Sequence, residues 1–141
     1  MSYLLDTDVV SEWVKPRPEP NVVAWFEAVD EDEVFMSVIS FAELERGIEL
    51  MPPGQRRDDL ASWIADDLTD RFAGRVLDVD RRVADAWGSV MARGQRSGRT
   101  LTVMDAFFAA TAESHDMTLV TRNVRDFDGL GVPILDPWEA A

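Results

Sequence analysis

The stretch "YLLDTDVVSE" (residues 3–12) joins a short apolar run to a helical segment and places two acidic residues at the junction. An apolar run of this length, bounded by polar residues, predicts a short strand. Apolar residues spaced three or four apart over residues 8–14 then predict a helix. Asp6 and Asp8 are therefore either residues that start a helix or the first members of a charged site that distant segments complete.

The same pattern recurs along the chain and predicts the fold class. Besides residues 3–6, candidate strands lie at 34–39, 75–79 and 118–121. Candidate helices lie at 8–14, 20–29, 41–51, 56–72, 81–96 and 103–115. Short, mostly unalternating apolar strands separated by helices are typical of a parallel sheet covered on both faces. We expect one α/β domain over residues 1–141, an α/β/α sandwich whose mainly parallel sheet of 4–5 strands is flanked by helices.

Composition narrows the class of protein. The chain has 141 residues, of which 46% are hydrophobic and 29% charged, as in an ordinary globular domain. It has no cysteine, which excludes a disulfide framework and thiolate metal ligands. We expect no signal peptide and no membrane span, because the first apolar run stops at Asp6 and no later run approaches the necessary length. These features favour a cytoplasmic protein.

The net charge of −13 restricts how the chain meets nucleic acid. A protein with this much negative charge repels a phosphate backbone. Any contact with nucleic acid must therefore be confined to a small area or bridged by a cation. Thirteen of the fourteen basic residues are arginines, and they include two pairs in "RGQRSGR" (93–99) and "TRNVRDF" (121–127). These two pairs are candidate contacts for RNA phosphates: Arg96, Arg99, Arg122 and Arg125.

Four acidic residues are predicted to meet at one edge of the sheet. In a parallel sheet the strands end at the same edge, where the following helices begin and ligands bind. Asp6 closes the first strand, Glu43 lies in the first turn of the helix after the second, and Asp126 follows the strand at 118–121. Asp105 reaches the same edge because the nine residues of "RGQRSGRTL" (93–101) allow the chain to return there.

Each acid also has a purely structural interpretation. Ser40 and Glu43 have the form of a capping box, Thr102 and Asp105 nearly so, and Asp8 fits an N-cap. Carboxylates that converge on one cleft nevertheless oppose each other's ionisation unless a cation lies among them. Oxygen ligands favour Mg²⁺ or Mn²⁺ over zinc. The only histidine, His115, is expected at the far end of its helix, away from these acids.

A divalent ion held by carboxylates suits phosphodiester hydrolysis. One or two ions polarise a phosphoryl oxygen, activate water and neutralise the leaving oxygen, without help from His, Cys or Lys. The ions also attract the phosphates that the acidic surface repels. The sequence therefore indicates a metal-dependent hydrolase acting on a nucleic acid.

The chain resembles the PIN-domain ribonucleases, and among them the VapC-type toxins of bacterial toxin-antitoxin pairs. The resemblance is carried, in order, by "YLLDTDVVSE" (3–12), "SVISFAELERGIE" (37–49), "VMDAFFAATAESHDMTLVTRNVRDF" (103–127) and "GVPILDPWE" (131–139). It implies that Asp6, Glu43 and Asp105 are the metal-site acids of an Mg²⁺- or Mn²⁺-dependent endoribonuclease.

The resemblance leaves the fourth acid open between two positions. Family members differ over which residue is acidic there, and we choose Asp126 as the fourth catalytic residue over Asn123. Asp8, Thr121 and Asn123 are expected to give polar support. Thr102 stands where many relatives have proline, and either residue can start a helix.

The resemblance also implies partners: an RNA substrate, an antitoxin protein that covers the cleft, a homodimer and a toxin-antitoxin hetero-oligomer. A group of apolar residues on the early helices offers either an antitoxin groove or, as we expect for most of them, core packing. The group consists of Trp13, Trp25, Phe41, Ile48, Trp63 and Ile64.

Two other functions compete with this interpretation. "DTDVV" (6–10) fits the start of haloacid-dehalogenase-type phosphatases, but that class expects a downstream basic residue and a Gly-Asp pair. The single lysine is Lys15 and the chain has no Gly-Asp step. An inert PIN-like module that only binds a partner is the second alternative. It would have no reason to keep four carboxylates together.

Overall fold

The computed structural model describes residues 1–139, and at its centre is one sheet of five strands in the order β3-β2-β1-β4-β5. All four strand pairings are parallel. The strands are β1 Tyr3–Leu5, β2 Val34–Ser37, β3 Val76–Leu77, β4 Thr118–Val120 and β5 Ile134–Leu135. The chain moves outward from β1 to β3, then crosses back to place β4 on the other side of β1. The strand order therefore reverses between β1 and β4, which is where open α/β sheets bind ligands.

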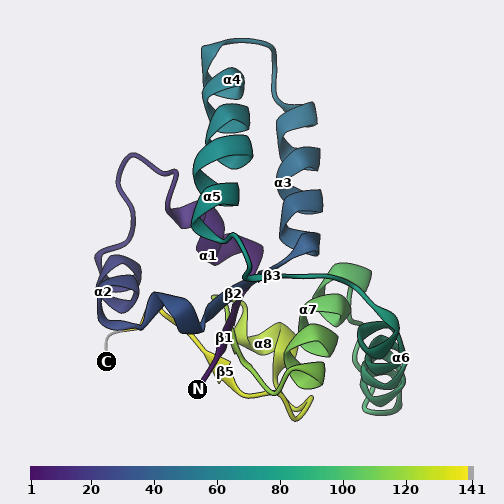
Figure 1. Ribbon diagram of the computed structural model, residues 1–141. Helices are drawn as coiled ribbons and strands as arrows, with labels where there is room; N and C mark the ends of the chain where they lie inside the picture. The colour runs from purple at the N-terminus through teal and green to yellow at the C-terminus, as the bar shows by residue number, and fades with distance from the viewer. Residues whose placement is uncertain (140–141) are drawn as a thin grey trace.

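Helices connect the strands and cover the sheet (Figure 1). They are α1 Thr7–Glu12, α2 Pro20–Ala28, α3 Val38–Leu50, α4 Gln55–Ser62, α5 Thr69–Arg71, α6 Arg81–Arg96, α7 Val103–Ser114 and α8 Val124–Phe127, with a 3₁₀ turn η1 at Glu31–Glu33 and a π-helical segment η2 at Trp63–Leu68. No helix among residues 1–139 has the length and apolar character needed to cross a membrane.

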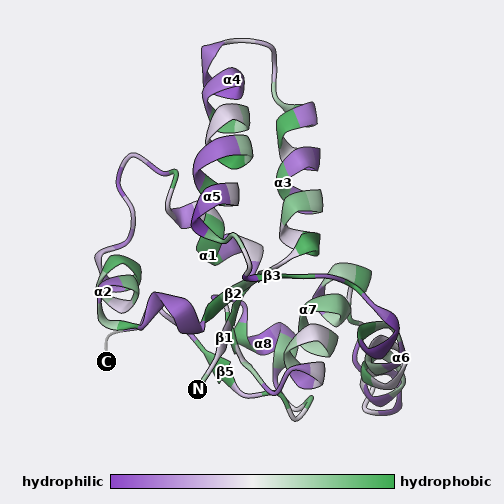
Figure 2. Ribbon diagram, in the orientation of Figure 1, coloured by the Kyte–Doolittle hydropathy of each residue, from purple (hydrophilic) through white to green (hydrophobic). Residues whose placement is uncertain are grey.

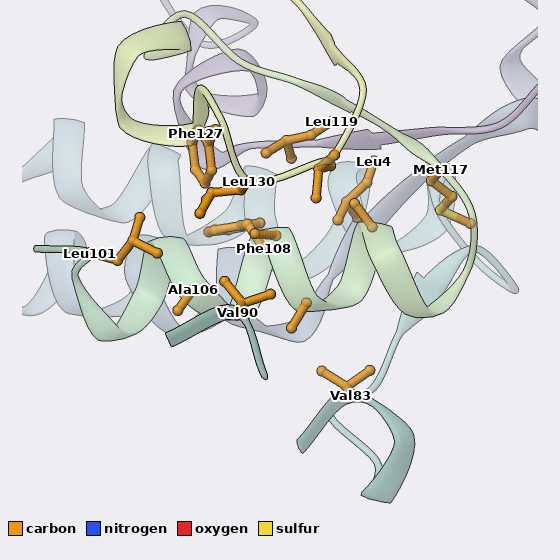
Figure 3. Close-up of a cluster of buried hydrophobic side chains, with 14 residues drawn as sticks. Leu4, Val83, Val90, Leu101, Ala106, Phe108, Met117, Leu119, Phe127 and Leu130 are labelled. Carbon is orange, nitrogen blue, oxygen red and sulfur yellow. The ribbon is translucent and has the colours of Figure 1, made fainter. Parts of the chain in front are cut away.

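Alternation along the strands places one hydrophobic cluster on each face of the sheet. Leu4 and Leu119 belong to the cluster with α6 and α7, whereas their neighbours Leu5 and Val120 belong to the cluster with α1, α3 and η2. Successive strand side chains point to opposite faces, so two adjacent apolar residues serve both layers. In Figure 3, Phe108 of α7 lies among Leu4, Phe127 and Leu130. The predicted α/β/α sandwich with a parallel sheet is confirmed.

The helices on the second face include an arm that extends away from the sheet. In Figure 1, α3 rises from the sheet and α4 returns beside it through η2 and α5. Figure 2 shows α4 as largely hydrophilic, and none of its residues is buried.

Residues 56–72 were predicted as one helix, and the residues at both junctions do keep helical dihedrals. The π-helical segment was not predicted; in it the Thr69 hydroxyl donates to the carbonyl of Ile64 at 2.8 Å.

The connection from α6 to α7 brings the chain back to the edge that holds the acids. Gly98 has φ +76°, and the amides of Gly98 and Arg99 donate to the carbonyls of Gln95 and Gly94. This pair of bonds is the Schellman ending of a helix, which needs a residue that tolerates positive φ. The two helices then pack side by side (Figure 1).

Several predicted boundaries were wrong. The helix predicted from residue 41 begins at Val38, because Ser37 caps it by accepting a hydrogen bond from the amide of Ile39. The strand predicted over 75–79 is only Val76–Leu77. Helix α8 and strand β5 were not among the predicted elements, since each is too short to show a period.

Candidate functional site

The reversal point of the sheet is occupied by Asp6, which follows β1. Its Oδ1 accepts a hydrogen bond from the amide of Thr7 at 2.7 Å and so caps α1. Its Oδ2 accepts one from the hydroxyl of Thr121, the residue after β4, also at 2.7 Å. Asp6 is 5% exposed and Thr121 is fully buried. The two neighbouring strand ends thus hold one carboxylate in a fixed orientation.

Thr7 connects this carboxylate to Glu43 of α3. Its hydroxyl donates to Oε1 of Glu43 at 2.7 Å and lies 3.0 Å from the hydroxyl oxygen of Ser40. The alternative interpretation of Ser40 and Glu43 as a capping box is excluded, and the prediction that Glu43 lies in the first turn of its helix was wrong. Because α3 begins three residues earlier than expected, Ser40 is buried inside the helix and Glu43 lies in its second turn. The sequence pattern did not predict Thr7 or Ser40 as site residues, although the position of the Thr7 hydroxyl between two candidate acids is a signal for it.

Asp105 enters from α7 and its helix start matches the prediction. The hydroxyl oxygen of Thr102 accepts a hydrogen bond from the amide of Asp105 at 3.1 Å, so Thr102 is the N-cap. Burial, followed by repulsion from Asp126 and Glu43, raises the pKa of the half-buried Asp105 above its ordinary value. Three acids from α3, α7 and α8 therefore lie near enough to influence one another.

Asp8 supports the site but does not cap the helix. It lies in the first turn of α1, and Asp6 occupies the N-cap position. Oδ2 of Asp8 accepts a hydrogen bond from the amide of Arg122 at 3.2 Å, which ties α1 to the loop after β4. Its Oδ1 is buried and has no hydrogen-bond partner among residues 1–139. Such an oxygen is unsatisfied unless water or a cation reaches it.

Burial and mutual repulsion make the ionised acids unfavourable in the absence of a cation. Burial, then repulsion from Asp8, raises the pKa of Asp6 from 3.8 to about 7, against the hydrogen bonds from Thr121 and Thr7. Burial also raises the pKa of Asp8 to about 6, opposed chiefly by the amide of Arg122. A bound divalent ion would reverse this tendency and keep the carboxylates ionised.

Both candidates for the fourth position lie beside the site. Asp126 is an exposed residue of α8 and lines a hollow of about 290 Å³ together with Asp105. Asn123 precedes α8, and its backbone amide donates to the hydroxyl oxygen of Thr121 at 3.0 Å. Thr121 thus links Asn123 to Asp6, whereas Asp126 adds a carboxylate near Asp105.

The four predicted arginines occupy different places. Arg99 and Arg125 line the hollow with the two acids, and one Arg99 nitrogen donates to the carbonyls of Arg125 and Asp126 at 3.2 and 3.4 Å. The Arg122 guanidinium lies 5.2 Å from the ring centre of Trp138. Arg96 is exposed in the last turn of α6. Both arginines of the hollow thus lie beside predicted site acids.

The donor set suits a hard divalent cation that retains part of its water shell. Within residues 1–139 no three Asp, Glu, His or Cys side chains form a group that could hold a metal ion. Mg²⁺ commonly keeps several waters and binds proteins through only one or two carboxylates. The oxygen ligands, the repulsion between them and the unsatisfied Oδ1 of Asp8 fit such an ion. His115 ends α7 as its C-cap, as predicted, and is no candidate ligand.

The early aromatic and aliphatic residues are mainly core residues, as expected. Ile48 and Ile64 are buried in the cluster beside α3, and the four aromatic members of the group pack against it. Trp13 and Trp63 additionally line two surface hollows, of about 630 and 550 Å³. These two tryptophans therefore serve both the core and the surface.

Comparison with known proteins identifies the class of this fold and site. Residues 3–132 match the PIN domain family. The chain belongs to that family.

Individual relatives cover almost the whole chain. It is 35% identical over 138 residues to the VapC ribonuclease Y4jK of Sinorhizobium fredii, covering 98% of this chain and 99% of the relative. It is 33% identical over 135 residues to the toxin FitB of Neisseria gonorrhoeae, covering 96% and 97%. The structure of FitAB bound to the IR36 DNA fragment superposes with a TM-score of 0.92 at 32% identity, covering 99% of this chain and 97% of that one.

Proposed function

We propose that this chain is an endoribonuclease that hydrolyses RNA phosphodiester bonds and acts as the toxin of a toxin-antitoxin pair. The observation that carries the proposal is the hydroxyl-linked set of acids at the sheet reversal. Thr121 and Thr7 bind Asp6, and Thr7 also binds Glu43. Family membership and the naming of one relative as a ribonuclease and another as a toxin support this assignment.

The cofactor is Mg²⁺ or Mn²⁺, and Asp6, Asp105 and Glu43 are the residues that would hold it. When bound, the ion supplies Lewis acidity toward a phosphoryl oxygen and lowers the pKa of a coordinated water. Asp126 completes the catalytic set, with Asn123 as the alternative at that position. Clustered carboxylates alone would repel the substrate, so the need for a cation follows from the charge of the site.

The remaining polar residues orient the acids and the RNA. Thr121 and Asp8 fix the loop after β4 against α1, because they contact Asp6 and the amide of Arg122. Arg99 and Arg125 hold phosphates that flank the cut, since they line the hollow with Asp105 and Asp126. Arg96, in the last turn of α6, extends this contact.

The proposal includes the assembly and location of the protein. An antitoxin protein covers the site, and the chain forms a homodimer and a hetero-oligomer with that antitoxin. FitB is named as a toxin, and its structural counterpart is an FitAB complex bound to DNA. An RNA target places the protein in the cytoplasm. We treat residues 1–141 as one PIN-like domain.

The phosphatase alternative has no support at the site. Its mechanism needs a basic residue close to the first aspartate, and the single lysine of the chain is Lys15. Lys15 is engaged elsewhere, 2.8 Å from Oε2 of the buried Glu12. The remaining alternative, an inert module that only binds a partner, is distinguished from a ribonuclease by whether the purified protein cleaves RNA.

The test is hydrolysis of RNA by the purified, partner-free protein. We expect cleavage with Mg²⁺ or Mn²⁺, none with EDTA, and loss of cleavage in Asp6→Asn and Asp105→Asn. Asp58→Asn, an exposed residue of α4 remote in sequence from the site acids, is the matched control and should cut like the wild type. Equal cleavage by the wild type and Asp6→Asn would indicate a contaminating nuclease and refute the proposal.

A further inference from the structure

A second polar cleft adjoins the hollow that holds Asp105. It has a volume of about 540 Å³ and runs between α8 and the segment that contains β5. Its lining residues are Arg122, Asn123, Val124, Arg125, Asp126, Ile134, Asp136 and Glu139. Arg125 and Asp126 line both the cleft and the hollow. An RNA strand whose phosphate lies at the acids thus has this cleft as its immediate neighbour.

The side chains at the mouth of the cleft have unused hydrogen-bonding capacity. Within residues 1–139 no hydrogen bond or ion pair is made by the side-chain amide of Asn123 or by the guanidinium groups of Arg122 and Arg125; only their backbone groups are bonded. Their backbones are nevertheless fixed, because the amides of Arg122 and Asn123 donate to Asp8 and Thr121. Hydrogen-bond donors and an acceptor are therefore presented from a backbone that Asp8 and Thr121 hold in place.

The Arg122 side chain, which lines the cleft, is also held by Trp138, a neighbour outside the lining. The Arg122 guanidinium lies over the ring of Trp138 at 5.2 Å from its centre. Trp138 is held by its amide, which donates to Oδ1 of Asp136 at 2.9 Å, and by its carbonyl, which accepts from Nδ2 of Asn21 at 2.8 Å. A planar guanidinium supported by an indole offers a flat face, and unpaired RNA bases stack on such faces.

Charge decides what kind of group enters this cleft. Three carboxylates, Asp126, Asp136 and Glu139, face two guanidinium groups. A phosphate there would meet more negative than positive charge, which is unfavourable. A neutral base carries no such penalty and can use the amide and guanidinium donors as well as the carboxylate acceptors. Ile134 and Val124 add apolar surface.

We propose that the cleft between α8 and β5 is a nucleobase subsite that binds the base of a nucleotide next to the cut and selects the sequence cleaved. Arg122 provides the stacking face and Asn123 reads the edge of the base. This inference rests on the proposed ribonuclease function. It assigns sequence selection to Arg122 and Asn123, in a cleft that shares Asp126 with the hollow that holds Asp105.

Cleavage of an RNA pool with random sequence tests the subsite. The wild type should prefer certain bases at one position beside the cut, and Arg122→Ala and Asn123→Ala should each weaken that preference at least about fivefold, the lower end for a lost base contact. Arg17→Ala removes an exposed arginine of the loop before α2 that lines none of these hollows, and should leave the preference intact. A slower reaction with an unchanged preference in both variants would overturn the subsite.

A binding measurement separates this inference from the ribonuclease proposal. In ¹⁵N-labelled Asp105→Asn protein, free nucleosides should shift the side-chain amide signals of Asn123, whereas ribose 5-phosphate, which has no base, should not. Shifts caused by ribose 5-phosphate, or by neither compound, would contradict a base subsite. If the wild type cleaves no RNA with any divalent ion, the ribonuclease proposal fails, and this measurement still decides the nature of the cleft.

Discussion

Thr7 joins two carboxylates of like charge. Its amide donates to Asp6 and its hydroxyl to Glu43, so a single residue fixes the end of β1 relative to α3. Outer residues that orient metal ligands commonly contribute about 10- to 100-fold to metal affinity or activity. The hydroxyl of Thr7 is therefore as much a part of the site as the acids that it orients.

Replacing Thr7 by valine tests this role. Thr7→Val keeps the size and the amide but removes the hydroxyl, so Mn²⁺ affinity measured by calorimetry should fall by about 10- to 100-fold. Thr7→Ser restores the donor and should recover most of the affinity. Valine and serine variants that both bind Mn²⁺ as the wild type does would exclude a positioning role.

The raised pKa of Asp6 predicts how stability depends on pH. Burial, followed by the charge of Asp8, holds this pKa at about 7, against 3.8 in the unfolded chain. Between these values the folded state keeps a proton that the unfolded state has lost, so the stabilising contribution of Asp6 is full below pH 4 and is lost as pH rises through 7. The contribution of one such group is at most about 1.4 kcal/mol per pH unit.

Urea denaturation in EDTA from pH 4 to 8 measures this dependence. Asp6→Asn should lose less stability over that range than the wild type, because it has no proton to release at this position. Added Mg²⁺ should stabilise the wild type more at pH 8 than at pH 5, since the ion competes with protons. Parallel stability curves for the two proteins in EDTA would show that Asp6 does not titrate in this range.

Among the elements, α7 depends on its cap. The hydroxyl oxygen of Thr102 accepts a hydrogen bond from the amide of Asp105, and loss of an N-cap hydroxyl typically costs about 1 kcal/mol of stability. Thr102→Ala should therefore lower the free energy of unfolding by about that amount. Thr100→Ala, an exposed neighbour in the same loop, should change it by less than about 0.5 kcal/mol. Equal effects of the two substitutions would mean that Thr102 does not cap the helix in solution.

Helices and strands were predicted well where the sequence showed a clear apolar pattern or a helix-capping residue. Thr102 marked the start of α7, and the apolar runs around Leu4 and Leu119 marked their strands. The prediction failed at α3, because both Ser37 and Ser40 are plausible caps and only the packed structure selects Ser37. The helical pattern of residues 56–72 does not reveal the π-helical segment, in which the carbonyl of Ile64 accepts a hydrogen bond from the Thr69 hydroxyl.

At the scale of the whole molecule, sheet order determines which residues meet. Parallel strands end at the same edge of a sheet, and this rule correctly predicted that the strand ends at Asp6 and Thr121, 115 positions apart, lie together. The same rule could not give side-chain bonds, so it did not predict the link from Thr7 to Glu43. Nor could it predict the cleft beside Asn123, which depends on the unpredicted strand β5.

The net charge of −13 predicts weak salt dependence of RNA binding. Only two or three arginines beside the acids can neutralise phosphates, so the slope of log affinity against log salt concentration should be about −1.4 to −2.1 for a single strand. Fluorescence anisotropy of Asp105→Asn protein with labelled RNA, in KCl at constant Mg²⁺, gives this slope. A slope of about −4 or steeper would instead require a broad basic surface on this protein.

The most direct test of a metal site at the sheet reversal is a crystal structure of the protein soaked in Mn²⁺, with anomalous diffraction to locate the ion. We predict an anomalous peak about 2 Å from carboxylate oxygens of Asp6 and Asp105, with waters completing the coordination. Glu43 should remain bonded to Thr7 or turn toward the ion. No peak at these acids, with their carboxylates still apart, would contradict the proposed metal site and the chemistry that depends on it.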